Sequence, residues 1–447
     1  MQLQELKTLL ALEPTWTVSI NGKEFVQLSN SEIEFSGDIV HFGRQHHRIL
    51  QLDWLRSNVM RLRMRNCGVL TFFPGNQLPG GIDLRRRRRL FQAQLAHALA
   101  AFYQGRVPVR EILHSDKQHG IGGAYPRFLF GNHAVISVDP EEESPVIDGL
   151  MRAALLWSEC IQHRVCVVVP GHRKQTTVSR LKDMTRFRSR FEWMEWDGSA
   201  IVPLDMDIPF PETHVHEFHL PQVGNEVSRI CAFAPDLLQA VPNIPARAIS
   251  IRLRGVEVAR ISECETTYPM GEPLQPIIET LARDRQIGSR HPLARAYEER
   301  WLESNLMRQI QELLPVCPEW IYPQVPSFAG TERNIIDLLT ATRDGRLVVI
   351  EVKASADPDL PFQAFDYWQA VERHRQAGDF QARGYFSGMR IQDIPALLVV
   401  VAPLLSFHKT FDRMVAALPG NLSLLQIGIN QSWKRKIKIL RRRGTLS

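Results

Sequence analysis

The feature that most constrains the fold is a pair of apolar segments in the last third of the chain, joined by a short turn. Ile335–Thr342 and Leu347–Lys353 have the composition of strands, and Arg343-Asp344-Gly345 lies between them. The neighbouring segments predict two helices and a further buried strand: Tyr297–Leu314, Phe362–Gln376 and Ala396–Val401. This order of elements predicts a compact α/β unit with a mixed sheet.

Two carboxylates and a lysine lie on the paired strands. Glu351 and Lys353 are two residues apart, so their side chains leave the strand on one face. A two-residue turn would pair Asp337 with Val352 and place Asp337 on the opposite face. A three-residue loop, with Gly345 in the left-handed conformation, pairs Asp337 with Glu351 instead. We predict the three-residue loop or a bulge, which brings both carboxylates together.

Two carboxylates that face a lysine are suited to metal-assisted hydrolysis. Asp337 and Glu351 can hold Mg²⁺, a hard ion that prefers oxygen ligands. The carbonyl of Val352 is a further candidate ligand. The metal would polarise a phosphodiester and lower the pKa of the attacking water. The ammonium of Lys353 would orient that water or stabilise negative charge in the transition state.

The set Asp337…Glu351-x-Lys353, on a strand pair between two helices, resembles the PD-(D/E)xK nuclease superfamily. The proline of the family name is absent, since Ile336 precedes Asp337. Glu303, in the preceding helix, occupies the position of the helix carboxylate found in many members.

The helix that follows the strand pair adds a second point of resemblance. Gln363-Ala-Phe-Asp-Tyr367 is similar to the Q-x-x-x-Y motif of the RecB-like branch. Gln363 and Tyr367 are four residues apart and share one helix face, so both could reach DNA or the active site.

The resemblance covers residues 291–410, about a quarter of the chain. It implies a restriction-endonuclease-like fold and a Mg²⁺-dependent deoxyribonuclease in which Mn²⁺ can replace Mg²⁺. The implied roles are metal binding for Asp337 and Glu351, water positioning for Lys353, support of the metal or water for Glu303, and orientation of the site or substrate for Gln363 and Tyr367. Two alternatives stay open: a nuclease that acts on RNA, and a non-catalytic nucleic-acid-binding or assembly protein that keeps the fold as a scaffold.

The pattern of elements divides the chain into four parts. Residues 1–80 predict a β-rich N-terminal domain, and residues 81–205 predict an α/β domain. Residues 206–290 form a mixed, proline-rich connecting region with a hairpin at Ile249–Ile261. Residues 291–447 are the nuclease-like domain and end in a basic tail.

The second part repeats the fourth weakly. With a shift of 214 residues, His133–Val138 falls on Leu347–Val352. The shift matches Gly123 with Asp337, Gly131 with Gly345, Ser137 with Glu351 and Asp139 with Lys353. Such a copy would have lost both metal-binding carboxylates, so its role would be binding or architecture. The alternative is coincidence, because helix–hairpin–helix–strand patterns are common.

Basic residues outnumber acidic ones by 54 to 48, and the excess is clustered. The clusters are Arg85–Arg89, residues 173–190 and Trp433–Arg443. Beside a phosphodiester-cutting motif they predict salt-dependent contacts with the nucleic-acid backbone. The residues predicted to make them are Arg85, Arg86, Arg87, Arg88, Arg89, Arg173, Lys174, Lys434, Arg435 and Lys436. The alternative for each cluster is a solvated helix face or a frayed tail.

Several classes of protein are excluded by the sequence. No stretch reaches the 18 or so apolar residues needed to span a bilayer, and the first residues lack the basic region of a signal peptide. The six cysteines are scattered and predict reduced thiols in a cytoplasmic protein. No nucleotide-hydrolysis motif occurs, so any ATP-driven step would come from a separate ATPase or helicase.

Overall fold

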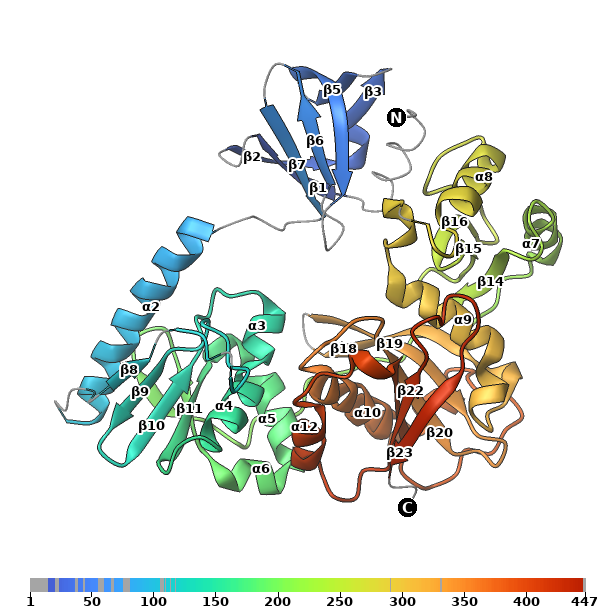
Figure 1. Ribbon diagram of the computed structural model, residues 1–447. Coiled ribbons are helices and arrows are strands. Elements are labelled where there is room, and N and C mark those ends of the chain that lie inside the picture. Colours follow the sequence, from blue (N-terminus) through green and yellow to red (C-terminus); the bar gives the residue numbers. More distant parts are fainter. Residues whose placement is uncertain are drawn as a thin grey trace.

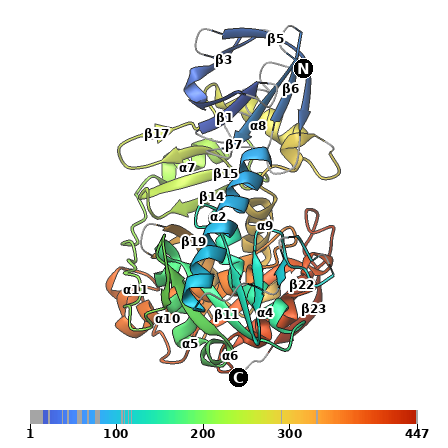
Figure 2. The same ribbon diagram turned by 90° about the vertical axis from the view of Figure 1, so that its left-hand side faces the viewer.

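The computed structural model describes residues 15–20, 24–36, 39–42, 45–54, 60–65, 68–74, 81–104, 108, 110–112, 114–116, 118–289, 291–329 and 332–444. These residues form a mixed α/β protein with four sheets, one in each of the four predicted parts (Figure 1). In Figure 2 the first sheet lies at the opposite end of the molecule from α6 and β23.

The first sheet is antiparallel and confirms the β-rich N-terminal region. Its strands are β1 (Thr15–Ile20), β2 (Glu24–Ser29), β3 (Ile33–Ser36), β4 (Ile39–Phe42), β5 (Gln45–Trp54), β6 (Met60–Met64) and β7 (Gly68–Pro74). Their order is β2-β1-β7-β6-β5-β4-β3. Trp16 and Val18 of β1 are fully buried, and their neighbours Thr17 and Ser19 are buried as well, so both faces of this strand are covered.

The second sheet lies between two layers of helices. Its strands run in the order β13-β12-β11-β10-β9-β8. The elements are α2 (Gly81–Phe102), β8 (Arg110–Ile112), β9 (Arg127–Phe130), β10 (His133–Ser137), α3 (Ser144–Asp148), α4 (Leu150–Ser158), β11 (Arg164–Pro170), α5 (Lys174–Asp183), α6 (Thr185–Arg190), β12 (Glu192–Trp196) and β13 (Ile201–Pro203). Helix α2 buries Phe91, Leu95 and Leu99 on one face, and α4 and α5 cover the other.

The third sheet is small, antiparallel and ordered β14-β15-β16-β17. Its elements are α7 (Gly224–Cys231), β14 (Leu238–Asn243), β15 (Ala248–Leu253), β16 (Val256–Ile261), β17 (Thr266–Thr267) and α8 (Leu274–Asp284). The predicted hairpin is present and turns at Gly255, which has a φ of +84°. A Cβ at Gly255 would lie 2.5 Å from the carbonyl of Arg300, so this turn packs closely against helix α9 (Glu298–Leu313).

The fourth sheet is ordered β18-β19-β20-β21-β22-β23. Its elements are α9 (Glu298–Leu313), β18 (Tyr322–Ala329), β19 (Glu332–Ala341), β20 (Leu347–Val352), α10 (Leu360–Ala377), α11 (Asp379–Ala382), β21 (Leu397–Pro403), α12 (Phe411–Ala417), β22 (Leu424–Ile429) and β23 (Ile439–Gly444). The predicted helices and strands are found, and β18, β22 and β23 add to them. The second half of the basic tail lies in the edge strand β23, so this part of the tail is not frayed.

The second and fourth sheets have the same topology. In each, the first two strand pairs are antiparallel, the next two are parallel and the last is antiparallel. Helices occupy the same connections, with α4 matching α10 and α5 and α6 matching α12. This shared order supports the predicted repeat.

The residue-by-residue match predicted for the repeat is wrong by one position. Strands β11 and β21 both end in proline. Two residues before that proline, Val168 pairs with Ser137 and Val401 pairs with Val352. Ser137 therefore corresponds to Val352 and not to Glu351. A slip of one residue moves every side chain of a strand to the opposite face, so the correction changes the chemistry.

In the corrected register, other side chains occupy the positions of the second sheet that correspond to the two carboxylates and the lysine. Arg127 stands at the place of Asp337, Ile136 at that of Glu351 and Val138 at that of Lys353, so the matches with Gly123 and Asp139 are also wrong. Arg127 is 1% exposed, and its guanidinium lies 6.0 Å from the ring of Trp157. Gly131 does lie in the hairpin turn, but that turn has two residues. The copy has lost the carboxylates, as predicted.

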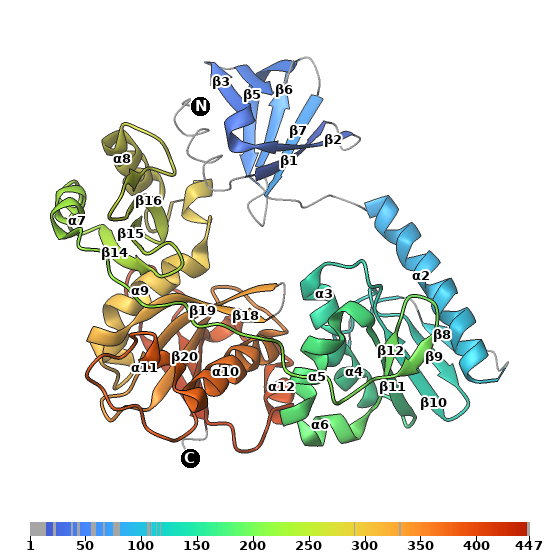
Figure 3. The same ribbon diagram turned by 180° about the vertical axis from the view of Figure 1, so that it is seen from behind.

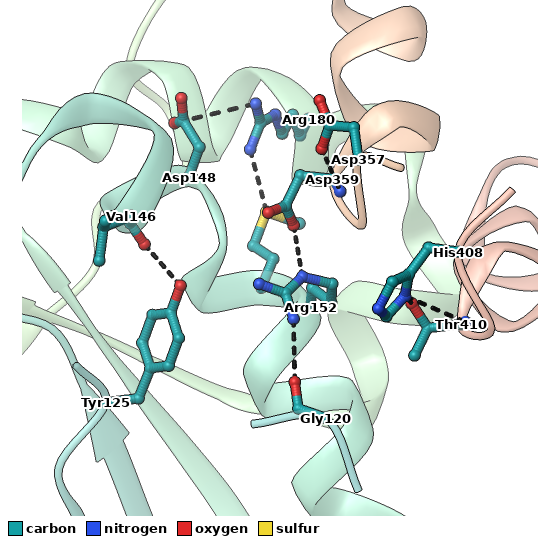
Figure 4. A network of polar contacts seen from close by, with 11 residues as sticks. Gly120, Tyr125, Val146, Asp148, Arg152, Arg180, Asp357, Asp359, His408 and Thr410 are labelled. Carbon is teal, nitrogen blue, oxygen red and sulfur yellow. Dashed lines mark hydrogen bonds and ion pairs between the residues drawn. The ribbon is translucent and has the colours of Figure 1, made fainter. Parts of the chain in front are cut away.

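The second and fourth domains pack through their helices and share one apolar core (Figure 3). Arg152 on α4 donates from Nε to Asp359 Oδ1 at 2.7 Å, directly before α10 begins (Figure 4). Arg180 on α5 donates two hydrogen bonds, of 2.7 and 2.6 Å, to the carboxylate of Asp366 on α10. The second domain therefore fixes helix α10, which carries Gln363 and Tyr367.

Candidate active site

The β19–β20 hairpin places Asp337 opposite Glu351. Leu338 pairs with Ile350, so the next position along each strand brings the two carboxylates level. The turn is a three-residue loop in which Gly345 has a φ of +92°. The loop predicted from the sequence is confirmed, and the two-residue alternative is ruled out.

Three charged side chains gather at the end of this hairpin. Asp337 Oδ2 accepts a hydrogen bond of 2.8 Å from the backbone N–H of Val352. Lys353 Nζ lies 3.3 Å from Glu351 Oε1 and 3.7 Å from Glu299 Oε2 of helix α9. Glu351 is 2% exposed, and its Oε2 is buried without a hydrogen-bond partner. One carboxylate oxygen of the site is thus left for a further ligand.

The single positive charge of Lys353 does not balance the negative charge of the buried carboxylates around it. Burial and the neighbouring Glu351 raise the pKa of Asp337 well above its ordinary value. Burial raises the pKa of Glu351 to about 7, although Lys353 opposes this shift. Burial lowers the pKa of Lys353, but Glu351 and Glu299 outweigh it and hold that pKa above its ordinary value. Lys353 is therefore a permanent cation shared among several carboxylates.

The Q-x-x-x-Y pair of α10 lies over the same site. Gln363 Nε2 donates to the hydroxyl of Tyr367 at 3.1 Å. Burial and the charge of Glu351 raise the pKa of Tyr367, so its hydroxyl keeps its proton. Because that oxygen accepts from Gln363, the phenol hydrogen remains available as a donor.

Glu303 lies near the pair and also has other partners, although its Oε1 makes no hydrogen bond. Its charge contributes to the raised pKa of Asp337. Its Oε1 lies 3.5 Å from Arg252 Nη1, and its Oε2 accepts from Gln324 Nε2 at 3.2 Å. Burial raises the pKa of Glu303, and Arg252 opposes that shift.

Arg252 and Gln324 are site residues that the sequence did not reveal. Arg252 comes from β15 of the third sheet, and Gln324 comes from β18, a strand with no clear pattern that contains two prolines. No local sequence signal links either residue to Glu303, because the contacts arise only when separate sheets pack together.

The fit of a divalent metal rests on Asp337 and Glu351. Within the described part of the chain, no three His, Cys, Asp or Glu side chains form a group that could hold a metal ion. Mg²⁺ is commonly bound by one or two carboxylates together with several waters. Two buried carboxylates with raised pKa values, one of them with an unpartnered oxygen, fit that mode. The carbonyl of Val352 stays a prediction as a further ligand.

The arginine cluster on α2 is partly engaged within the protein. Arg87 Nε lies 3.0 Å from Asp139 Oδ2, and Arg88 donates twice to the carboxylate of Glu142. Arg89 is exposed. The side chains of Arg85 and Arg86 lie outside the described residues. At least two of the five arginines therefore hold α2 to its domain.

The other predicted nucleic-acid contacts differ in exposure. Arg173 is 5% exposed, and Lys174 Nζ lies 3.0 Å from Glu195 Oε1. Lys434 pairs with Glu298. Arg435 and Lys436 are exposed, and Lys436 Nζ lies 3.7 Å from Glu312 Oε2. The exposed residues of the tail remain the better candidates for contacts with DNA.

No protein-family model matches the chain, and no curated protein is significantly similar to it. Among the helices that the structure describes, none combines the length and apolar character needed to cross a membrane.

Proposed function

We propose that the fourth domain is a metal-dependent nuclease that hydrolyses phosphodiester bonds in DNA. The observation that carries this proposal is the position of Asp337 opposite Glu351, with Lys353 Nζ 3.3 Å from Glu351 Oε1. A scaffold has no physical reason to bury two carboxylates side by side, because their repulsion costs folding free energy. A site that binds a divalent cation has such a reason.

The proposed roles follow from the protonation of each group. A bound Mg²⁺ or Mn²⁺ would be held by Asp337 and Glu351 and would activate water and polarise the phosphate. Lys353 is held in its charged form, so it would act as a fixed cation beside the phosphate and not as a base. Tyr367 keeps its proton and would donate a hydrogen bond to a phosphate oxygen or to the attacking water.

Exposed arginines would hold the DNA backbone. Arg89, Arg435 and Arg441 all lie on the surface of the two α/β domains. Contacts of this kind carry no sequence information but set affinity and its dependence on salt. The N-terminal half of the chain would position the nucleic acid, in line with the absence of the carboxylate pair from the second sheet.

The test is a cleavage assay on plasmid and single-stranded DNA, with Mg²⁺ or Mn²⁺ against EDTA. Wild type should cut only with metal, and Glu351→Gln should lose at least about a hundredfold in rate, because it removes a metal ligand without changing size. Glu312→Gln, an exposed change on α9, is the matched control and should cut normally. Metal-dependent cutting of RNA alone would favour the RNA alternative. Salt-sensitive binding without cutting of either nucleic acid would favour the scaffold.

A further inference from the structure

A cleft of about 340 Å³ opens beside the candidate active site, between the third and fourth sheets. Its polar walls are Asn243, Arg252 and Arg260 of the third sheet and Gln324 of β18. Its apolar walls include Pro242, Pro326 and Ile335. Ligand pockets of about 300 Å³ and above combine apolar walls with a few placed polar groups in this way.

Two residues that line the cleft, Gln324 and Ile335, lie next to the carboxylate pair in the sheet. Gln324 lies between the strand pairs Pro323–Leu338 and Val325–Ile336, which places it level with Asp337. Ile335 and Asp337 are two residues apart on β19 and share one face. If the reacting phosphate of a nucleic-acid strand lies at Asp337, the neighbouring nucleotide of that strand would therefore lie over the cleft.

The two arginines differ in what they can offer a ligand. Arg252 is 3% exposed and is fixed by Ser250 Oγ at 3.0 Å and Gln324 Oε1 at 3.0 Å, besides its pair with Glu303. The side chain of Arg260 is 43% exposed, and its Nε lies 2.8 Å from Glu257 Oε1. Glu257 forms an ion pair with the guanidinium, and the planar group has further N–H donors for an anion.

We propose that this cleft is a subsite for the nucleotide next to the phosphate that is cut. Arg260 would bind its phosphate, Gln324, held by Arg252, would contact a polar group of the base or sugar, and the prolines and Ile335 would pack against the base. The inference rests on the proposed function and gives the 206–290 region, whose role the sequence left open, the task of holding the substrate strand.

The test is equilibrium binding of a fluorescein-labelled single-stranded DNA oligonucleotide, measured by anisotropy in EDTA over a range of salt. Arg260→Ala should weaken binding several-fold and lower the slope of log affinity against log salt by about 0.7, the value for one phosphate contact on a single strand. Arg260→Lys should keep most of that slope. The matched control is Arg229→Ala, which removes an exposed arginine of the same region that also pairs with a glutamate three residues earlier.

A second experiment locates the contact. Once the cut position is mapped, a single uncharged methylphosphonate next to it should weaken binding by wild type and leave Arg260→Ala unaffected. An equal methylphosphonate effect in both proteins, or an Arg260→Ala variant that binds like wild type, would overturn the subsite. Absence of cutting by wild type, with the Arg260→Ala binding defect intact, would refute the nuclease and leave the cleft as a DNA-binding site.

Discussion

Asp337 and Glu351 are the residues at which folding and the proposed chemistry conflict most. Both are buried beside a single lysine, and burial acts against the charged form of each. In the absence of a metal, the folded protein relieves this conflict by taking up protons. The free-energy cost of burying these two charged carboxylates should therefore appear as a dependence of stability on pH.

We expect the metal-free protein to lose stability as pH rises from about 5 to about 8. Glu351 has a folded-state pKa of about 7 against an ordinary 4.5. The folded state thus binds the proton more tightly than the unfolded state between these values, and the free energy of unfolding falls by up to about 3 kcal/mol. Urea unfolding in EDTA at a series of pH values measures this.

Glu351→Gln supplies the control for the pH dependence. It should flatten the profile, because glutamine does not titrate. Mg²⁺ added at about pH 8 should raise the stability of wild type more than that of the variant. An identical dependence of the unfolding free energy on pH in both proteins would show that folding does not raise the pKa of Glu351.

The buried pair of Arg252 and Glu303 makes a second prediction at the residue scale. Arg252→Met should lower the free energy of unfolding by about 3 kcal/mol, because Glu303 is then left buried without its cation. The double variant Arg252→Met with Glu303→Leu should recover part of that loss. Urea unfolding of wild type, the two single variants and the double variant gives the coupling free energy between the two residues. Additive losses would mean that the two residues stabilise the protein independently.

At the scale of elements, the β19–β20 hairpin sets the geometry of the site through its turn. Gly345 has a φ of +92°, and a Cβ there would lie 2.1 Å from the carbonyl oxygen of Arg390. Any side chain would have to displace that backbone. The turn cannot move without shifting the strands that carry Asp337 and Glu351.

Gly345→Ala should therefore destabilise the protein by more than the 1–2 kcal/mol or so that a positive φ alone costs. It should also weaken Mg²⁺ binding, measured by calorimetry. Gly388→Ala is the matched control, since Gly388 has a φ of +82° with nothing within 4 Å of the added Cβ. Equal losses in the two variants would show that contact with Arg390 is unimportant.

The sequence predicts this hairpin well because the determining information is local. One loop of three residues and one glycine decide whether Asp337 meets Glu351. The register of the repeat in the second domain is harder to predict. A slip of one residue between two similar apolar strands keeps a plausible hydrophobic pattern, and only the face of the sheet on which each side chain lies changes. The role of Arg252 cannot be predicted from the sequence, because its contact with Glu303 depends on how two sheets pack.

For the whole molecule, the main feature is the core shared by the second and fourth domains. Two arginines of the second domain, Arg152 and Arg180, bind carboxylates at the start and middle of α10. The helix that carries Gln363 and Tyr367 is thus held from outside its own domain. The two domains should behave as one unit in unfolding.

Arg180→Met tests this coupling. It leaves the carboxylate of Asp366 without its bidentate partner and should destabilise the protein by about 3 kcal/mol. Hydrogen exchange measured by mass spectrometry should rise in α4 and α10 together. Arg413→Met, which removes an exposed pair with Glu159, is the control. Faster exchange in α5 alone would show that the domains open separately.

The loss of carboxylates from one of two like-built sheets has a consequence for a double helix. A duplex offers two backbones of opposite polarity, whereas the proposed site of this chain has the one carboxylate pair Asp337 and Glu351. If the proposed chemistry holds, each encounter severs one backbone. Supercoiled plasmid should then relax to nicked circles, and linear molecules should follow only after a second encounter or with a second copy of the chain.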